Sequence, residues 1–170
     1  GGQVFLTGLS AIFGAAALLF LQTVWKRGRY LRAFQTELEQ NLTRLERTNR
    51  QLKNVEKRDW KRRFTPLHTE VHHQIRIDDP TLFLRLNTEM MDLEEIYQGI
   101  RHLDALSQPG NTVGPEVSKG EVITDLNSLT ERLKEAIDTV EDIRTNKWIY
   151  RQIGSSQSLY YEPIDLGDNS

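Results

Sequence analysis

The sequence predicts an all-α protein, with one N-terminal transmembrane helix followed by a cytoplasmic antiparallel helical bundle or coiled coil of about three to four helices. Three observations lead to this prediction. Val4 to Trp25 form a run of 22 residues without a charged side chain. After this run, apolar residues recur at intervals of three or four over most of the chain, which is the period of an amphipathic helix. No segment carries the alternating pattern of a strand with any weight.

The apolar run at residues 4–25 is long enough to cross a bilayer as a helix. At about 1.5 Å per residue it reaches roughly 33 Å, compared with about 30 Å of hydrocarbon. Positive charges follow it, so the positive-inside rule predicts a cytoplasmic location for the rest of the chain and an N-terminus outside. A cleaved signal peptide is the competing interpretation, but such peptides carry their charge before a shorter apolar run. The residues expected at the membrane interface are Trp25, Lys26, Arg27, Arg29 and Arg32.

Small residues gather in the first two thirds of the apolar run. Spaced four apart, they allow a second helix to approach closely, as small-xxx-small pairs do in membranes. Glycine and alanine are also common in membrane helices that make no such contact, so both interpretations stay open. The candidates for transmembrane packing are Gly8, Ser10, Ala11, Gly14 and Ala15.

The net charge of −2 conceals two oppositely charged parts. Residues 26–63 carry 13 Lys and Arg against 5 Asp and Glu, whereas residues 64–170 carry 9 against 19. The basic part adjoins the predicted anchor, and the acidic part is distal. The sequence contains no cysteine, which excludes disulfides and thiolate chemistry.

Residues 26–63 are predicted to form a basic juxtamembrane stalk helix, either continuous with the anchor or broken near Gly28. An apolar stripe begins at Leu31 and continues at helical spacing. Asn41 and Asn49 fall beside this stripe. They are interpreted as flank positions wetted by solvent, with register-setting polar positions of a bundle as the alternative.

The end of the stalk combines basic and aromatic side chains, as surfaces that bind anionic lipid or nucleic acid do. A solvated helix end, where cations offset the helix dipole, is the alternative. The stalk helix would place this patch about 33 Å from the bilayer, so lipid contact requires the helix to lie flat or fold back. The patch consists of Lys57, Arg58, Trp60, Lys61, Arg62 and Arg63.

Residues 64–106 are predicted to form a helical hairpin that belongs to the bundle. Thr65 and Pro66 have the residue types of a helix start, so the first helix is expected to begin at Pro66. The second helix is expected to begin at Pro80 and to continue to about Leu106.

The remaining chain is predicted to contain one more helix. Residues 107–120 hold two Pro and three Gly and are expected to form a flexible linker. A C-terminal bundle helix is predicted at residues 121–153. Residues 154–170 lack a helical period and are expected to form an extended or disordered tail.

His68 and His72 are the one weak candidate for a metal site, because residues four apart on a helix can face the same ion. The sequence does not match the helical zinc motif, since Thr69 stands where that motif has glutamate. No glycine-rich phosphate loop and no pairing of nucleophile and base is found. We therefore predict no catalytic residue, cofactor or small-molecule substrate, and we do not expect an enzyme.

These observations favour a single-pass membrane-anchored helical adaptor or accessory subunit that binds a protein partner, or assembles with itself, at the cytoplasmic membrane face. The bilayer is an expected partner, and nucleic acid is not. Two alternatives stay open. One is a membrane-tethered signalling or defence element whose helix packing responds to membrane events. The other is binding of anionic lipid or nucleic acid by the basic stalk.

Overall fold

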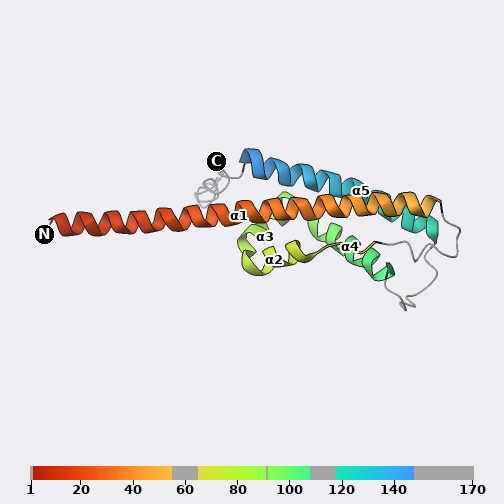
Figure 1. The fold of residues 1–170 in the computed structure, drawn as a ribbon, viewed down its shortest axis with the longest axis horizontal. Helices are drawn as coiled ribbons and strands as arrows, with labels where there is room; N and C mark the ends of the chain where they lie inside the picture. The colour runs from red at the N-terminus through yellow and green to blue at the C-terminus, as the bar shows by residue number, and fades with distance from the viewer. Residues whose placement is uncertain (1, 55–64, 91, 108–117, 148–170) are drawn as a thin grey trace, which may run out of the picture.

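A computed structural model describes residues 2–54, 65–90, 92–107 and 118–147. Its longest element is α1, a single helix from Gly2 to Lys53 (Figure 1). The helix passes through Gly28 without a break, which decides between the two forms of stalk that the sequence allowed. By length and composition, α1 is the one described helix that could cross a membrane.

Four shorter helices follow α1, and the described residues contain no strand, which confirms the all-helical prediction. They are α2 at Glu70–Asp78, α3 at Pro80–Glu89, α4 at Leu93–Ser107 and α5 at Lys119–Asp142. A π-helical segment, η2 at Ile143–Lys147, extends α5. The predicted patch from Lys57 to Arg63, most of the 107–120 linker, the predicted helix end at 148–153 and the 154–170 tail lie outside the described residues.

The two halves of α1 differ in their surroundings. Residues 2–25, the bare segment, are exposed except for the half-buried Val24. Residues 26–53, the packed segment, lie against the shorter helices, and together with them form what we call the helical domain (Figure 1). The bare segment projects from one end of this domain.

Helix α5 runs antiparallel to the packed segment of α1. Near the end distant from the bare segment, Asn49 Nδ2 donates to Asn127 Oδ1 at 2.6 Å. Near the other end, Arg144 Nε donates to Gln35 Oε1 at 3.1 Å. The residue number therefore rises along α5 as it falls along α1.

One hydrophobic core joins all the helices of the domain, and the apolar stripes predicted from the sequence supply most of it. On α1 the buried stripe members are Leu31, Phe34, Leu38, Leu45 and Leu52. On the shorter helices they include Ile75, Leu82, Leu86, Leu93, Ile96, Ile100, Leu126, Leu133 and Val140.

The first helix of the predicted hairpin begins later than expected. Helix α2 starts at Glu70 rather than Pro66, and its N-cap is Thr69, whose side chain makes no capping hydrogen bond. The prediction was wrong because Asn41 binds both the backbone N–H and the carbonyl of His68. These groups are thus held outside any helix.

The second helix of the predicted hairpin is two helices. Met90 has φ −117° and ψ 85°, and it ends α3 before α4 begins at Leu93. This break lets α3 and α4 lie in different directions, so that Leu86 and Leu93 both reach the same core. The sequence contains a signal for the second start, because Glu94 and Glu95 occupy the first turn of α4, where acidic residues are favourable.

Helix α5 begins with a capping box. Ser118 Oγ accepts a hydrogen bond from the Glu121 N–H at 3.2 Å, and Glu121 Oε2 accepts one from the Ser118 N–H at 2.9 Å. The helix therefore starts two residues earlier than the predicted boundary at 121.

Candidate functional site

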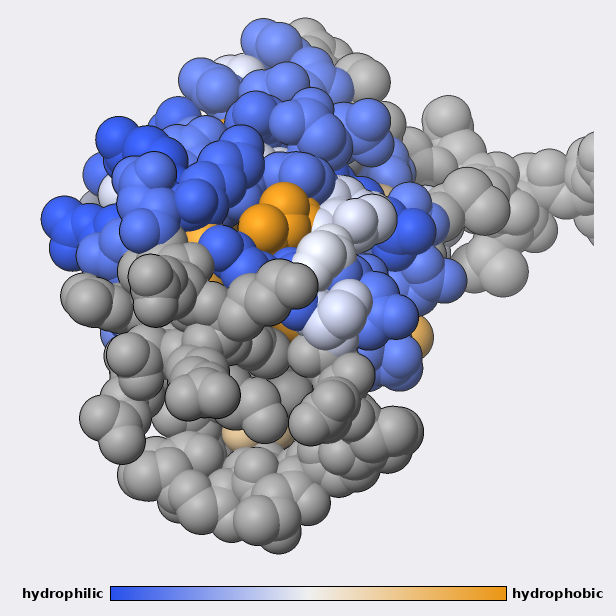
Figure 2. All heavy atoms as spheres, turned by 90° about the vertical axis from the view of Figure 1, so that its right-hand side faces the viewer, coloured by the Kyte–Doolittle hydropathy of each residue, from blue (hydrophilic) through white to orange (hydrophobic). Residues whose placement is uncertain are grey.

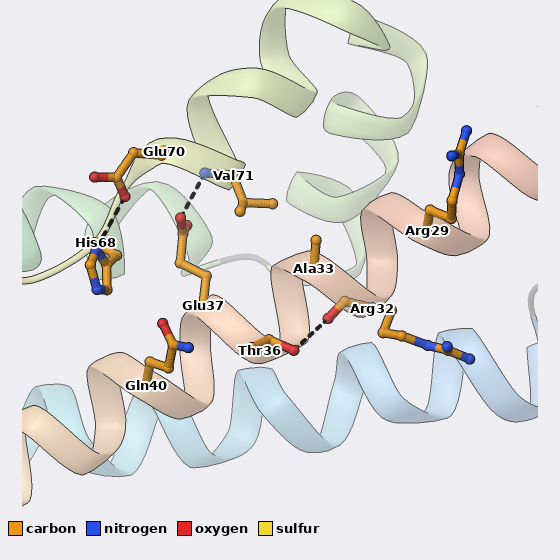
Figure 3. Close-up of a pocket in the computed structure, with 9 residues that line it drawn as sticks. All are labelled: Arg29, Arg32, Ala33, Thr36, Glu37, Gln40, His68, Glu70 and Val71. Carbon is orange, nitrogen blue, oxygen red and sulfur yellow. Dashed lines mark hydrogen bonds and ion pairs between the residues drawn. The ribbon is translucent and has the colours of Figure 1, made fainter.

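A buried carboxylate on α1 forms the N-terminal cap of α2. Glu37 is 3% exposed, and its oxygens accept hydrogen bonds from the N–H groups of Val71 at 2.6 Å and His72 at 3.2 Å. These are the second and third residues of α2, whose N–H groups have no partner within the helix. A negative charge is favourable here because the positive end of the helix dipole points at it. Figure 3 shows Glu37 extending from α1 toward Val71.

Tyr97 of α4 binds the same carboxylate. Its hydroxyl donates to Glu37 Oε1 at 2.7 Å, so Glu37 connects α1, α2 and α4. Burial raises the pKa of Tyr97 well above its ordinary value, and the nearby Glu37 charge adds to this rise. The tyrosine therefore stays protonated and keeps donating over the physiological pH range.

The imidazole of His72 stacks on Tyr97, with ring centroids 3.7 Å apart and planes 12° apart. Phe83 of α3 contacts the same imidazole at a centroid distance of 5.2 Å. Burial lowers the pKa of His72 to about 4, because this aromatic environment disfavours the charged form. Its Nε2 atom is buried without a hydrogen-bond partner.

His68 and His72 do not form the pair that the sequence suggested. His68 precedes α2, so the spacing of a helix does not apply to the two residues. The Nδ1 atom of His68 lies 3.4 Å from Glu70 Oε2, whereas His72 is in the core. Within the described parts of the chain, no group of three His, Asp or Glu side chains is arranged to hold a metal ion.

A shallow groove of about 490 Å³ lies over Glu37, between α1 and the start of α2 (Figure 3). A second hollow of about 320 Å³ continues it along α1, and the two share Thr36 and Gln40. We call the two together the α1 groove. Its lining residues are Arg29, Arg32, Ala33, Thr36, Glu37, Glu39, Gln40, Thr43, Arg44, Arg47, His68, Glu70 and Val71.

The α1 groove has the chemistry of a binding surface. Four arginines line it, whereas one of its three carboxylates, Glu37, is turned toward α2. Arg44 also donates to the carbonyl of Pro66, which anchors the segment before α2. The groove is open and carries no pairing of nucleophile and base among its described residues.

A second polar cluster lies where the bare segment meets the helical domain. Arg27 Nε donates to Asp79 Oδ2 at 2.6 Å, and Arg27 Nη2 donates to Oδ1 at 3.1 Å. Asp79 also caps α3 by accepting from the Leu82 N–H at 3.0 Å. Beside this pair, the Tyr30 hydroxyl donates to Asp78 Oδ2 at 2.6 Å.

The ion pair at this junction is largely excluded from water, since both side chains are 11% exposed. Partial burial opposes ionisation of Asp79, but the hydrogen bonds from Arg27 and Leu82 outweigh it and lower the pKa of the carboxyl. For the exposed Asp78, the hydrogen bonds from Tyr30 and Gln74 lower the pKa. Both acids are thus ionised at neutral pH.

The structure places the other predicted interface residues around this junction. The Lys26 ammonium lies 5.5 Å from the centroid of the Tyr30 ring. The Arg29 guanidinium lies 5.7 Å from that of Trp25. Arg32 lines the α1 groove. Arg27, another predicted interface residue, forms an ion pair with Asp79. The location of these residues at a membrane surface stays a prediction.

The predicted packing residues of the bare segment touch no other part of the domain. Gly8 and Gly14 have no neighbouring atom within 4 Å of where a Cβ would stand, and Ser10, Ala11 and Ala15 are exposed. Their contact with a second helix stays a prediction. So does binding by the basic patch, because Lys57, Arg58, Trp60, Lys61, Arg62 and Arg63 lie outside the described residues.

Glu37 and Tyr97 were not predicted to be polar partners, and the prediction that solvent surrounds Asn41 was wrong. Asn41 is fully buried rather than wetted by solvent, and its amide binds both backbone groups of His68 at 2.7 Å. A signal was present in the sequence. Glu37 and Asn41 each follow a buried stripe residue, Phe34 and Leu38, by three positions. This spacing puts them on the edge of the core-facing side.

Comparison of the chain with protein-family models, with curated proteins and with solved structures finds no match. The class that the described residues define is an all-helical protein, in which one of the described helices could span a membrane by its length and composition. Function must therefore be inferred from the geometry of the chain itself.

Proposed function

We propose that the chain is a single-pass membrane-anchored adaptor or accessory subunit, whose helical bundle binds a protein partner at the cytoplasmic face of the membrane. One observation carries the proposal. The bare segment is apolar on all sides and packs against none of the other residues that the structure describes, whereas the helical domain begins within two residues of Trp25. An apolar helix about 33 Å long that is left uncovered needs an apolar solvent, and a bilayer supplies one of the right thickness.

The direction of insertion follows from charge. Lys26, Arg27 and Arg29 directly follow the bare segment, and positive charge of this kind is retained in the cytoplasm. We therefore place the helical domain in the cytoplasm and the N-terminus outside. The small-residue face around Gly8 and Gly14 would pack against a partner's membrane helix or a second copy.

We expect the surface that binds the partner to consist of polar rather than apolar residues of the domain. The leucine stripes close on one another within a single chain, so they are not available for a partner. The α1 groove remains exposed, and its arginines favour a partner segment with acidic side chains. Continuity of α1 from the bilayer into this groove would hold the partner at a fixed height above the membrane.

Photocrosslinking in native membranes tests the proposal. A photoreactive residue replaces Gln40, which lies where the two hollows of the groove meet, and a matched residue replaces Asp125, which is exposed on α5 and does not line the groove. We expect one defined adduct from position 40 and none from position 125. The adduct should disappear when Arg32 and Arg47 are changed to glutamate. Equal adducts from both positions, or an adduct insensitive to charge reversal, would contradict the groove as the binding surface.

A signalling role is the second candidate, and the junction favours it. Arg27 and Tyr30 link the end of the bare segment directly to the corner between α2 and α3. A tilt of the membrane helix would therefore change the position of that corner. Spin-label distances between Leu18 and Thr88, measured in bilayers of different thickness, test this role. Invariant distances would count against it.

A further inference from the structure

The corner between α2 and α3 carries the exposed apolar side chains of the helical domain. Ile77 is 62% exposed and Leu84 is 65% exposed. Outside the bare segment they are the large hydrophobic residues that the described chain leaves exposed. Each points away from the core, because Ile75 and Leu82, two residues earlier on the same helices, are buried.

The junction fixes the height of this corner relative to the bare segment. Asp79 binds Arg27 and Asp78 binds Tyr30. Arg27 is about 3 Å beyond Trp25 along the helix axis and Tyr30 about 8 Å, at roughly 1.5 Å per residue. The head-group layer on each side of a bilayer is about 5 to 7 Å thick. If the bare segment spans the hydrocarbon, the α2–α3 corner lies within the head-group layer or at its outer edge.

Leu84 belongs to α3, which packs beside α2 at this corner. The Arg76 guanidinium is 5.8 Å from the centroid of the Phe83 ring, so the residues preceding Ile77 and Leu84 in sequence are in contact. Figure 1 shows α2 and α3 together at the end of the domain that faces the bare segment. The opposite end, seen in Figure 2, is predominantly hydrophilic where it is described, with small, separate apolar spots.

The charges around the corner suit an anionic surface. Lys26, Arg29 and Arg76 are exposed there, and the charge of Asp79 is balanced by Arg27. The remaining acid, Asp78, is hydrogen-bonded to Tyr30 and Gln74. The local excess of positive charge would attract anionic lipid head groups, while the two apolar side chains enter the boundary below them.

We propose that the α2–α3 corner is a second membrane-contact surface, on which Ile77 and Leu84 insert into the interfacial layer of the cytoplasmic leaflet. The corner and the membrane helix together give the domain two points of attachment. The domain then has a fixed orientation on the membrane instead of pivoting about α1. This inference rests on the proposed anchoring by the bare segment.

Depth measurements on single-cysteine variants test the inference, and the natural absence of cysteine makes labelling selective. The full chain is reconstituted in vesicles of phosphatidylcholine and phosphatidylglycerol. An environment-sensitive fluorophore is attached in the variants L18C, I77C, L84C, H73C and D125C. Quenching is then compared between nitroxides placed at the lipid head group and deep in the acyl chain.

We expect deep quenching for the Leu18 position and head-group quenching for Ile77 and Leu84, several-fold stronger than for Asp125. His73 is exposed on the same side of α2 as Ile77 but one turn, about 6 Å, farther from the junction, so its label should be quenched less. If the Leu18 label is quenched deep in the bilayer but the Ile77 and Leu84 labels are quenched no more than the Asp125 label, the corner does not contact lipid. The proposed anchoring by the bare segment is then still supported. If the Leu18 label is not quenched, the anchor fails and this inference fails with it. If the labels at Ile77 and Leu84 report an apolar environment but neither nitroxide quenches them, a protein rather than lipid covers the corner, and the proposal is overturned.

Discussion

The bare and packed segments of α1 belong to one unbroken helix, yet their apolar residues are distributed differently around the helix axis. In residues 2–25 apolar side chains occur on every side, and the segment packs against no other described helix. In residues 26–53 the large apolar residues fall mainly on one stripe that faces the domain, and most of the charged residues lie off this stripe. The distribution of apolar residues around the helix, rather than helix propensity, separates the two segments.

The packed segment contains buried polar side chains with hydrogen-bond partners, and the bare segment contains none. Glu37, Asn41 and Thr48 are buried on α1, and the first two bind backbone groups of other segments. In the bare segment, the hydroxyls of Thr7 and Thr23 donate to the carbonyl four residues earlier, and that of Ser10 donates to the carbonyl three residues earlier, all within the same helix. Polar contacts thus define where the domain attaches along α1.

Truncating one leucine in each segment gives the largest expected contrast. Leu38 is fully buried, so Leu38→Ala should lower the free energy of unfolding of the helical domain by about 4 kcal/mol. Leu18 is 58% exposed, and Leu18→Ala should change it by less than about 0.5 kcal/mol. Denaturant titration of the full chain in detergent micelles, followed by circular dichroism, measures both. Equal effects would show that the two segments do not differ as described.

Removing the carboxylate of Glu37 should have the next largest effect. Glu37→Ala leaves the N–H groups of Val71 and His72 and the Tyr97 hydroxyl buried without their acceptor. We expect a loss of about 3 kcal/mol in the same titration. Glu39→Ala is the matched control, because Glu39 is exposed on the same helix and should cost less than about 0.5 kcal/mol. Tyr97→Phe, which removes one of the three bonds, should cost about 1 kcal/mol.

The apolar run and the stripes were predictable because each depends on the spacing of residues within one helix. The all-helical class, the start of α3 at Pro80 and most of the α1 stripe follow from that local information. The role of Glu37 was not predictable in the same way. It depends on the N-terminus of α2, which is 34 residues away in sequence.

Two helix boundaries show the same limit. Thr65 and Pro66 have suitable residue types for a helix start, but Asn41 of α1 holds the next residues in a different conformation. The apolar stripe from Leu82 to Leu103 is continuous in sequence, so it predicted one helix, whereas the structure has two helices that both contribute to the core. At the first of these boundaries a contact between distant segments overrides the local pattern.

The buried polar groups of the packed segment predict a dependence of stability on pH. Burial lowers the pKa of His72 to about 4 in the folded chain, compared with an ordinary value of 6.5. The unfolded chain therefore binds the proton more tightly, so this contribution is complete above pH 6.5 and is lost as the pH falls toward 4. We expect the loss to be about 2 kcal/mol by pH 4.5.

Comparison with His72→Phe isolates this contribution, because phenylalanine keeps the ring stack on Tyr97 and removes the unpartnered Nε2 atom. The variant should lose about 2 kcal/mol less than the wild type between pH 6.5 and 4.5. His73→Gln is the control, since His73 is exposed and its replacement should leave the pH dependence unchanged. If the stability of His72→Phe depends on pH as strongly as that of the wild type, groups other than His72 cause the dependence.

The smallest expected effect concerns the point where the two segments of α1 meet. In a double-mutant cycle of Arg27→Gln and Asp79→Asn, we expect a coupling of about 1 kcal/mol, because the pair is bidentate and mostly shielded from water. Asparagine can still cap α3, so the cycle separates the ion pair from the cap that Asp79 gives to Leu82. The coupling should shrink in high salt only slightly, since a shielded pair is weakly screened. A coupling near zero would mean that the remaining contacts hold the α2–α3 corner at the end of the bare segment. The height of that corner would then depend on Tyr30 and Asp78 instead.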